Sequence, residues 1–93
     1  MSTHGWHFLQ GADVTQKAFD EELGRRLAEH RKSLALSQDF LGTMLRRDQT
    51  YVSKIEKGKR TLSVYELARW AKALNLTASD VTELVSQGES DVE

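Results

Sequence analysis

The sequence predicts an all-α protein, a compact bundle of five helices, from three observations. Apolar residues recur at spacings of three and four along most of the chain, as on one face of a helix. No stretch alternates apolar and polar residues for long enough to indicate a β-strand. Residues that can cap a helix N-terminus stand before each apolar segment. The 93 residues suffice for one domain, and the absence of cysteine excludes a disulfide framework and a thiolate metal site.

The first helix is expected from about Thr15 to Ser33. Three of its acidic residues, at positions 20–22, lie toward the N-terminal half, and Arg31 and Lys32 lie at its end, which is the order that the helix dipole favours. Residues 1–14 show little periodicity and contain two glycines, so a flexible N-terminal arm is expected there. The apolar stripe of the helix is expected to consist of Phe19, Leu23, Leu27 and Leu34.

Each of the next four helices begins at a side chain that can accept a hydrogen bond from the first helical turn. Gly58 and Asn75 can adopt the left-handed conformation that ends a helix. Residues 87–93 are rich in acids and predict an acidic C-terminal tail, which leaves 15–86 as the folded domain. In chain order, the caps and the expected helices are Ser37 for 38–45, Asp48 for 49–57, Ser63 for 64–74 and Thr77 for 78–85.

Charge is distributed unevenly along the chain, although the formal net charge is only −1. The segment from Leu23 to Lys72 contains 12 basic and 5 acidic side chains, a charge of +7. The remainder contains 1 basic and 9 acidic side chains, a charge of −8. A basic centre between acidic ends indicates a polyanionic partner such as a nucleic acid.

The residues 38–57 form two short predicted helices joined by the link Arg46-Arg47. Gly42 lies in the first helix at a position where a neighbouring helix packs closely. Apolar contacts between the helices and the core are expected from Leu41, Leu45, Val52 and Ile55. This arrangement is a helix-turn-helix motif, in which the second helix can enter the major groove of DNA.

Residues 23–85 resemble the Cro/repressor-type (XRE) helix-turn-helix domain, which has the lambda-repressor-like fold. The resemblance rests on three runs in a fixed order, LGRRLAEHRKSLALSQ, VSKIEKG and ELARWAKALNLTASDV. Two positions depart from the family, which often has alanine at Gly42 and a small turn residue, commonly glycine, at Arg46. The resemblance implies a transcriptional regulator, often a repressor, that binds a near-palindromic operator as a homodimer.

The resemblance also assigns roles to side chains of the motif. Gln49 and Thr50 match the base-reading positions of the family, and their chemistry suits an adenine edge and a thymine methyl group. Lys54 is expected to reach a guanine or a nearby phosphate, and Tyr51 and Ser53 are expected to face outward beside it. Contacts to the DNA backbone are expected from Gln38, Arg46, Arg47, Tyr51, Ser53, Lys57, Lys59 and Arg60.

Other residues of this region have structural interpretations. In the family, the acid that matches Glu56 pairs with an arginine of the first helix, and Arg31 stands at that position. The resemblance therefore implies a structural salt bridge between Arg31 and Glu56. Trp70 is in phase with the apolar positions of its helix and is expected in the core. Tyr65 fits either the rim of the core or a phosphate contact.

The residues do not predict an enzyme, because the sequence has no glycine-rich phosphate loop, no cysteine and no recognisable pair of catalytic carboxylates. No cofactor or small-molecule effector is indicated. A metal site at His4 and His7 is not expected, because no further ligands accompany them. The chain shows no membrane-spanning or signal segment, so we expect it in the cytoplasm of a bacterium or among phage proteins, associated with the nucleoid when bound to DNA.

The expected dimer interface lies on the last helix, at Val81, Leu84 and Val85, with possible help from the apolar residues of the arm, Trp6, Phe8 and Leu9. Two other functions fit the same domain. The first is an antitoxin or a restriction–modification controller, which would keep the DNA binding. The second is a protein-interaction module that does not bind DNA.

Overall fold

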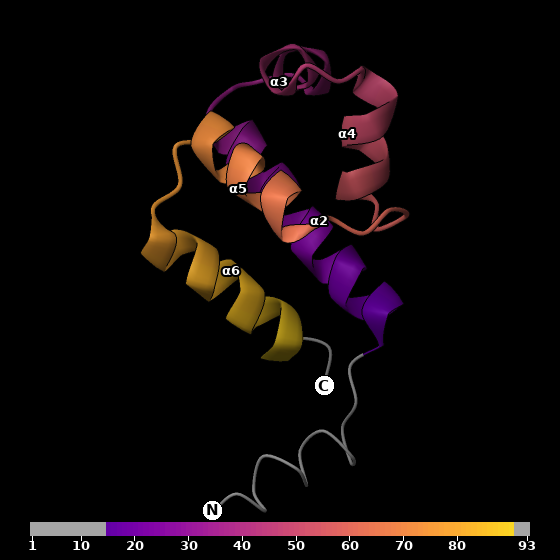
Figure 1. Ribbon diagram of the computed structural model, residues 1–93, viewed down its shortest axis with the longest axis vertical. Helices are drawn as coiled ribbons and strands as arrows, with labels where there is room; N and C mark the ends of the chain where they lie inside the picture. Colours follow the sequence, from indigo (N-terminus) through magenta and orange to yellow (C-terminus); the bar gives the residue numbers. More distant parts are fainter. Residues whose placement is uncertain (1–14, 91–93) are drawn as a thin grey trace, which may run out of the picture.

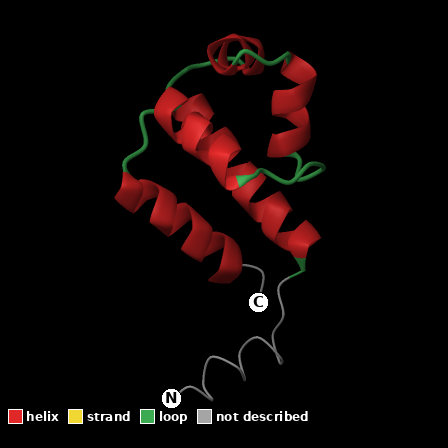
Figure 2. Cartoon of the chain, viewed as in Figure 1, coloured by secondary structure: helices red, strands yellow, loops and turns green. Residues whose placement is uncertain are grey.

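The computed structural model describes residues 15–90, which form five α-helices and no strand (Figures 1 and 2). The all-α prediction is therefore confirmed over this range. The predicted arm over 1–14, with its apolar residues and histidines, and residues 91–93 of the predicted tail lie outside the described residues. In chain order, the helices are α2 (Gln16–Ser33), α3 (Gln38–Leu45), α4 (Gln49–Glu56), α5 (Val64–Ala73) and α6 (Ala78–Ser90).

The helices begin where the sequence predicts. Asp48 accepts a hydrogen bond from the Tyr51 backbone N–H at 2.9 Å, and Thr15, Ser37 and Ser63 cap their helices in the same way. Ser63 and Glu66 form a reciprocal capping box. Thr77 and Asp80 exchange the same two hydrogen bonds at the start of α6, and the Thr77 backbone N–H lowers the pKa of Asp80.

The helix ends agree less well with the prediction. Gly58 and Asn75 have the expected left-handed conformation, with φ of 72° and 57°. The last helix, however, does not end at about Val85 but continues to Ser90. Packing against α2 explains the additional turn of this helix, because α6 runs beside α2 (Figure 1) and Gly88 is buried against the ring of Phe19. None of the helices within residues 15–90 is long and apolar enough to cross a membrane.

All five described helices contribute side chains to the core, and the predicted burial of Trp70 in it is confirmed. Two apolar predictions are wrong. Leu34 follows the end of α2 and is exposed, so it is no part of the buried stripe. Leu84, predicted at a dimer interface, is buried in the core because the inner face of α6 packs on α2. The largest fully buried side chains are Trp70, Leu27, Leu41, Ile55 and Val52.

Two glycines allow the close backbone approaches that position the motif. At Gly24 of α2, a Cβ atom would lie 2.2 Å from the Ile55 carbonyl oxygen of α4. At Gly42 of α3, a Cβ atom would lie 2.8 Å from the carbonyl oxygen of Arg47. Gly42 therefore packs against the backbone of the turn that joins the two motif helices, where an added methyl group would require that turn to move.

Candidate nucleic-acid interface

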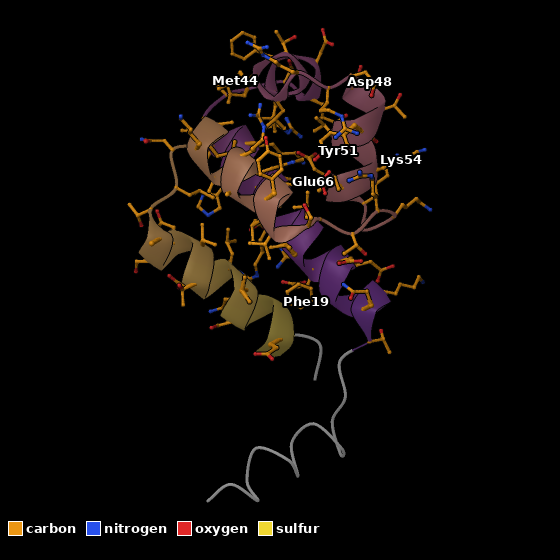
Figure 3. All side chains as sticks on the ribbon, viewed as in Figure 1. Phe19, Met44, Asp48, Tyr51, Lys54 and Glu66 are labelled. Atoms are coloured by element: carbon orange, nitrogen blue, oxygen red, sulfur yellow. The ribbon has the colours of Figure 1, made fainter. Side chains whose placement is uncertain are left out.

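The outer face of α4 carries the three side chains predicted to read bases. Gln49, Thr50 and Lys54 are exposed, and Figure 3 shows Lys54 on the outer side of the helix. A surface hollow of about 390 Å³ is lined by these three residues together with Ser53, Lys57 and Lys59. The fold thus brings six of the predicted contact residues into one polar, basic surface.

The predicted ion pair between Arg31 and Glu56 forms behind this surface. Arg31 Nε donates to Glu56 Oε2 at 2.7 Å, Arg31 Nη2 donates to Glu56 Oε1 at 3.0 Å, and both side chains are buried. Arg31 Nη1 also donates to the carbonyl oxygen of Leu36 at 2.6 Å. One guanidinium group therefore fixes the end of α4 and the link before α3 relative to α2.

Gln38, at the start of α3, connects this ion pair to the outer surface. Its Nε2 donates to Glu56 Oε1 at 2.9 Å, and its Oε1 accepts from Gln49 Nε2 at 3.3 Å. Gln49 keeps its carbonyl oxygen and its second N–H for another partner. These contacts cannot be predicted from sequence spacing, because the paired residues are 11 and 18 positions apart in the chain.

Tyr51 does not face outward, and the prediction that it contacts the DNA backbone is wrong. Only 6% of its surface is exposed. Trp70 Nε1 donates to the Tyr51 hydroxyl at 3.1 Å, and that hydroxyl donates to Glu66 Oε2 at 3.3 Å. Burial raises the pKa of the Tyr51 phenol. Helix α4 packs against α3 and α2, and Tyr51 also lies against Glu66 and Trp70 of α5, so the buried face of α4 is wider than its apolar residues alone indicate.

Two of the predicted phosphate ligands meet over the ring of Tyr51. The Arg47 guanidinium lies 3.7 Å from the ring centroid, and that of Arg60 lies 5.0 Å from it. Arg60 Nη1 donates to Glu66 Oε2 at 2.7 Å, and Arg47 Nη1 lies 3.5 Å from the same oxygen. The Ser63 backbone N–H, followed by Arg60, lowers the pKa of Glu66 to about 2. The sequence identifies Glu66 only as a helix-capping residue and carries no signal that places it in the site.

The start of α2 holds the loop between α4 and α5, which carries Lys59 and Arg60. Asp20 is buried and accepts hydrogen bonds from Gln16 at 2.9 Å and from the Thr61 hydroxyl at 2.5 Å. Gly58 packs against the backbone of α2 at Glu21, where a Cβ atom would lie 2.5 Å from the Glu21 Cα atom. These contacts fix the positions of Lys59 and Arg60 relative to the hollow on the outer face of α4.

Arg46 remains exposed at the turn between α3 and α4. It has the left-handed conformation, with φ of 60°, at the position where the family commonly has glycine. Its backbone closes the tight turn, and its side chain adds positive charge to a pocket of about 300 Å³ that Arg47 and Arg69 also line.

Among the residues the structure describes, no group of three or more His, Cys, Asp or Glu side chains is placed to hold a metal ion.

Two short helices joined by a tight turn, the second with an exposed polar face among basic side chains, define a helix-turn-helix DNA-binding domain. Residues 22–84 match the family described as the helix-turn-helix domain. The chain belongs to this family and is of the XRE type within it.

Three similar known proteins are named as controllers or regulators. The chain is 36% identical over 59 residues to the control protein C.MunI from Mycoplasma sp. The aligned residues cover 62% of this chain and 80% of that protein. The crystal structure of the restriction-modification controller protein C.AhdI from Aeromonas hydrophila has 31% identity and a TM-score of 0.62, covering 66% of this chain and 92% of that one. The clp gene regulator ClgR from C. glutamicum has 25% identity and a TM-score of 0.69, covering 77% and 92%. The chain is therefore a helix-turn-helix DNA-binding regulator.

Proposed function

We propose that this protein is a sequence-specific transcriptional regulator that binds a near-palindromic operator as a homodimer, with α4 of each copy in the major groove. The observation that carries the proposal is the hollow on the outer face of α4, where Gln49, Thr50 and Lys54 lie among lysines. A protein that binds DNA acts where the DNA is, so we place it in the cytoplasm of a bacterial cell.

The side chains of this hollow suit direct readout. Gln49 keeps one N–H and its carbonyl oxygen, which together can pair with the major-groove edge of adenine. The Thr50 methyl group can contact a thymine methyl, and Lys54 can donate to the acceptors of guanine. Phosphate contacts are proposed for Gln38, Arg46, Arg47, Ser53, Lys57, Lys59 and Arg60.

A second copy of the chain is proposed to cover the apolar face between α5 and α6. Val81 and Val85 are half-buried on α6, and Val81 continues into a groove of about 650 Å³ that Leu67 and Ala71 line. Val64, on the same groove, is 87% exposed and so enlarges one contiguous apolar surface rather than standing alone. A two-fold dimer would present two α4 helices to half-sites about 34 Å apart.

Selection of bound duplexes from a random pool, followed by fluorescence anisotropy on the selected duplex, tests the proposal. Gln49→Ala should relax the preference at one base pair and weaken binding by roughly 1–3 kcal/mol. Lys59→Ala should weaken binding to all duplexes and reduce the salt slope by about one unit. Lys17→Ala is the matched control, because it removes the same charge from the exposed start of α2, outside both the hollow and the apolar face between α5 and α6.

Two outcomes would contradict the proposal. One is the absence of salt-sensitive binding to any duplex. The other is a protein partner whose binding survives the combined changes Arg47→Glu and Lys54→Glu, which would indicate an interaction module without DNA binding.

A restriction–modification controller is a second candidate, favoured by the similarity to C.MunI and C.AhdI. The selected operator should then occur upstream of genes for a DNA methyltransferase or an endonuclease that neighbour the gene for this chain. Neighbouring genes without either enzyme would exclude this candidate, and a toxin that copurifies with the protein would indicate an antitoxin instead.

A further inference from the structure

Glu66 is an acidic side chain next to the surface proposed to bind DNA, where a negative charge by itself should weaken binding. It lies at the start of α5 and faces α4, as Figure 3 shows for Glu66 and Tyr51. Its contacts are with two arginines that are themselves proposed phosphate ligands. The inference below rests on the proposed DNA-binding function.

Both carboxylate oxygens of Glu66 are occupied by groups of the protein. Oε1 accepts from the Ser63 backbone N–H at 2.9 Å. Oε2 accepts from Arg60 at 2.7 Å and from the Tyr51 hydroxyl at 3.3 Å, and it lies 3.5 Å from Arg47 Nη1. One oxygen therefore links Arg47, which precedes α4, to Arg60, which follows it.

The aromatic ring of Tyr51 is the second group that contacts both arginines. Both guanidinium groups lie over this ring, which is buried and fixed by its hydrogen bond from Trp70. The side chains of Arg47 and Arg60 remain 43% and 39% exposed. Each arginine thus keeps surface available to a phosphate while its position is already set.

We propose that Glu66 is a positioning residue for DNA binding, which holds Arg47 and Arg60 on the Tyr51 ring so that both meet the DNA backbone in a prearranged geometry. Without Glu66, the two long side chains would have to be ordered on binding, which should weaken binding about tenfold. The screened repulsion between one acid and DNA at moderate salt is smaller, about two- to threefold. Loss of the ordered arginines should therefore change the affinity for DNA more than loss of the repulsion does.

Glu66→Gln tests this inference, because an amide can still accept the capping hydrogen bond from Ser63 but no longer attracts the arginines. Binding of the full chain to the selected duplex is measured by anisotropy, and thermal unfolding by circular dichroism checks the fold. We expect Glu66→Gln to bind about tenfold more weakly. Asp39→Asn is the matched control: it removes one exposed acid of α3 that forms no ion pair within residues 15–90, and this variant should bind equally or up to threefold more tightly.

A second measurement separates positioning from a general structural effect. In a chain with Arg47→Ala and Arg60→Ala, the further change Glu66→Gln should no longer weaken binding and should slightly strengthen it. Equal or tighter binding by the single variant, or the same tenfold loss without the arginines, would overturn the role of Glu66 while leaving the proposed function intact. If the unchanged protein bound no duplex, the proposed function would fail and this role with it.

Discussion

The carboxylates of Glu56 and Glu66 both accept hydrogen bonds from arginine, but they lie at different depths. Glu56 is buried with Arg31, whereas Glu66 pairs with arginines whose side chains are partly exposed. A buried charge without its partner is strongly destabilising, whereas pairs open to solvent contribute little to stability. At the scale of single residues, we therefore expect Glu56 to matter for folding and Glu66 mainly for the arrangement of the DNA-binding arginines.

Arg31→Ala should lower the free energy of unfolding by about 3–5 kcal/mol, because it leaves the Glu56 carboxylate buried and unpaired. Urea denaturation followed by circular dichroism measures the change. Replacing both partners, with Arg31→Met and Glu56→Met, should recover much of the loss, since no buried charge then remains. A single variant as stable as the unchanged protein would contradict the structural role of the pair.

Stability should depend on pH through Glu66. Its pKa is lowered from 4.5 to about 2 in the folded chain, so its contribution to stability is fully present above 4.5 and is lost as the pH falls toward about 2. Glu66→Gln should therefore be less stable by about 1 kcal/mol at neutral pH, and this difference should narrow as the pH falls from 4.5 toward about 2. Urea titrations at several pH values measure the difference, and a gap that does not change with pH would argue against the lowered pKa.

At the scale of helices, the crossing of α2 and α4 depends on Gly24. Helix propensity alone predicts that alanine at this position would stabilise α2 by up to about 1 kcal/mol. The structure predicts the opposite sign, because a Cβ atom would lie 2.2 Å from the Ile55 carbonyl oxygen, a backbone atom that cannot rotate away.

Gly24→Ala should therefore destabilise the protein by about 1–3 kcal/mol and move α4 relative to Gln38, which weakens DNA binding. Chemical denaturation gives the stability, and anisotropy gives the affinity. Ser33→Ala, at the exposed end of the same helix, is a suitable control for helix propensity. A stabilised Gly24→Ala variant would show that the two helices can separate without cost.

At the scale of the whole molecule, a dimer should couple stability to concentration. If a second copy covers the face between α5 and α6, the melting temperature should rise with protein concentration. Val64→Asp places a charge on that face and should abolish the dependence, whereas Thr50→Asp, on the outer face of α4, should leave it unchanged. Analytical ultracentrifugation provides the direct measurement, and a monomer at all concentrations would refute the dimer.

The distribution of charge over the whole chain bears on DNA binding as well. A net charge of −1 would argue against a DNA-binding protein, yet the chain combines a basic centre with acidic ends. Within that centre, the fold places Lys54, Lys57 and Lys59 on one surface, while Glu56 points inward and accepts a hydrogen bond from Arg31. Local charge, not the total, therefore determines what this surface can bind.

The sequence by itself determined the helices, their caps, the helix-turn-helix motif and the Arg31–Glu56 pair. These features depend on contacts between residues three or four apart, or on family positions that the sequence preserves, so they can be read along the chain. The sequence also places Arg46 in the turn between the two motif helices, where it has the left-handed conformation.

Only the tertiary structure decided the roles of Tyr51, Glu66 and Leu84 and the length of α6. Tyr51 is buried because its ring and hydroxyl contact Trp70 and Glu66 of α5, and Leu84 is buried because α6 packs on α2. Glu66 meets Arg47 and Arg60 only after the loop before α5 brings them together. Each of these outcomes depends on surfaces formed by segments distant in the chain, which local spacing cannot encode.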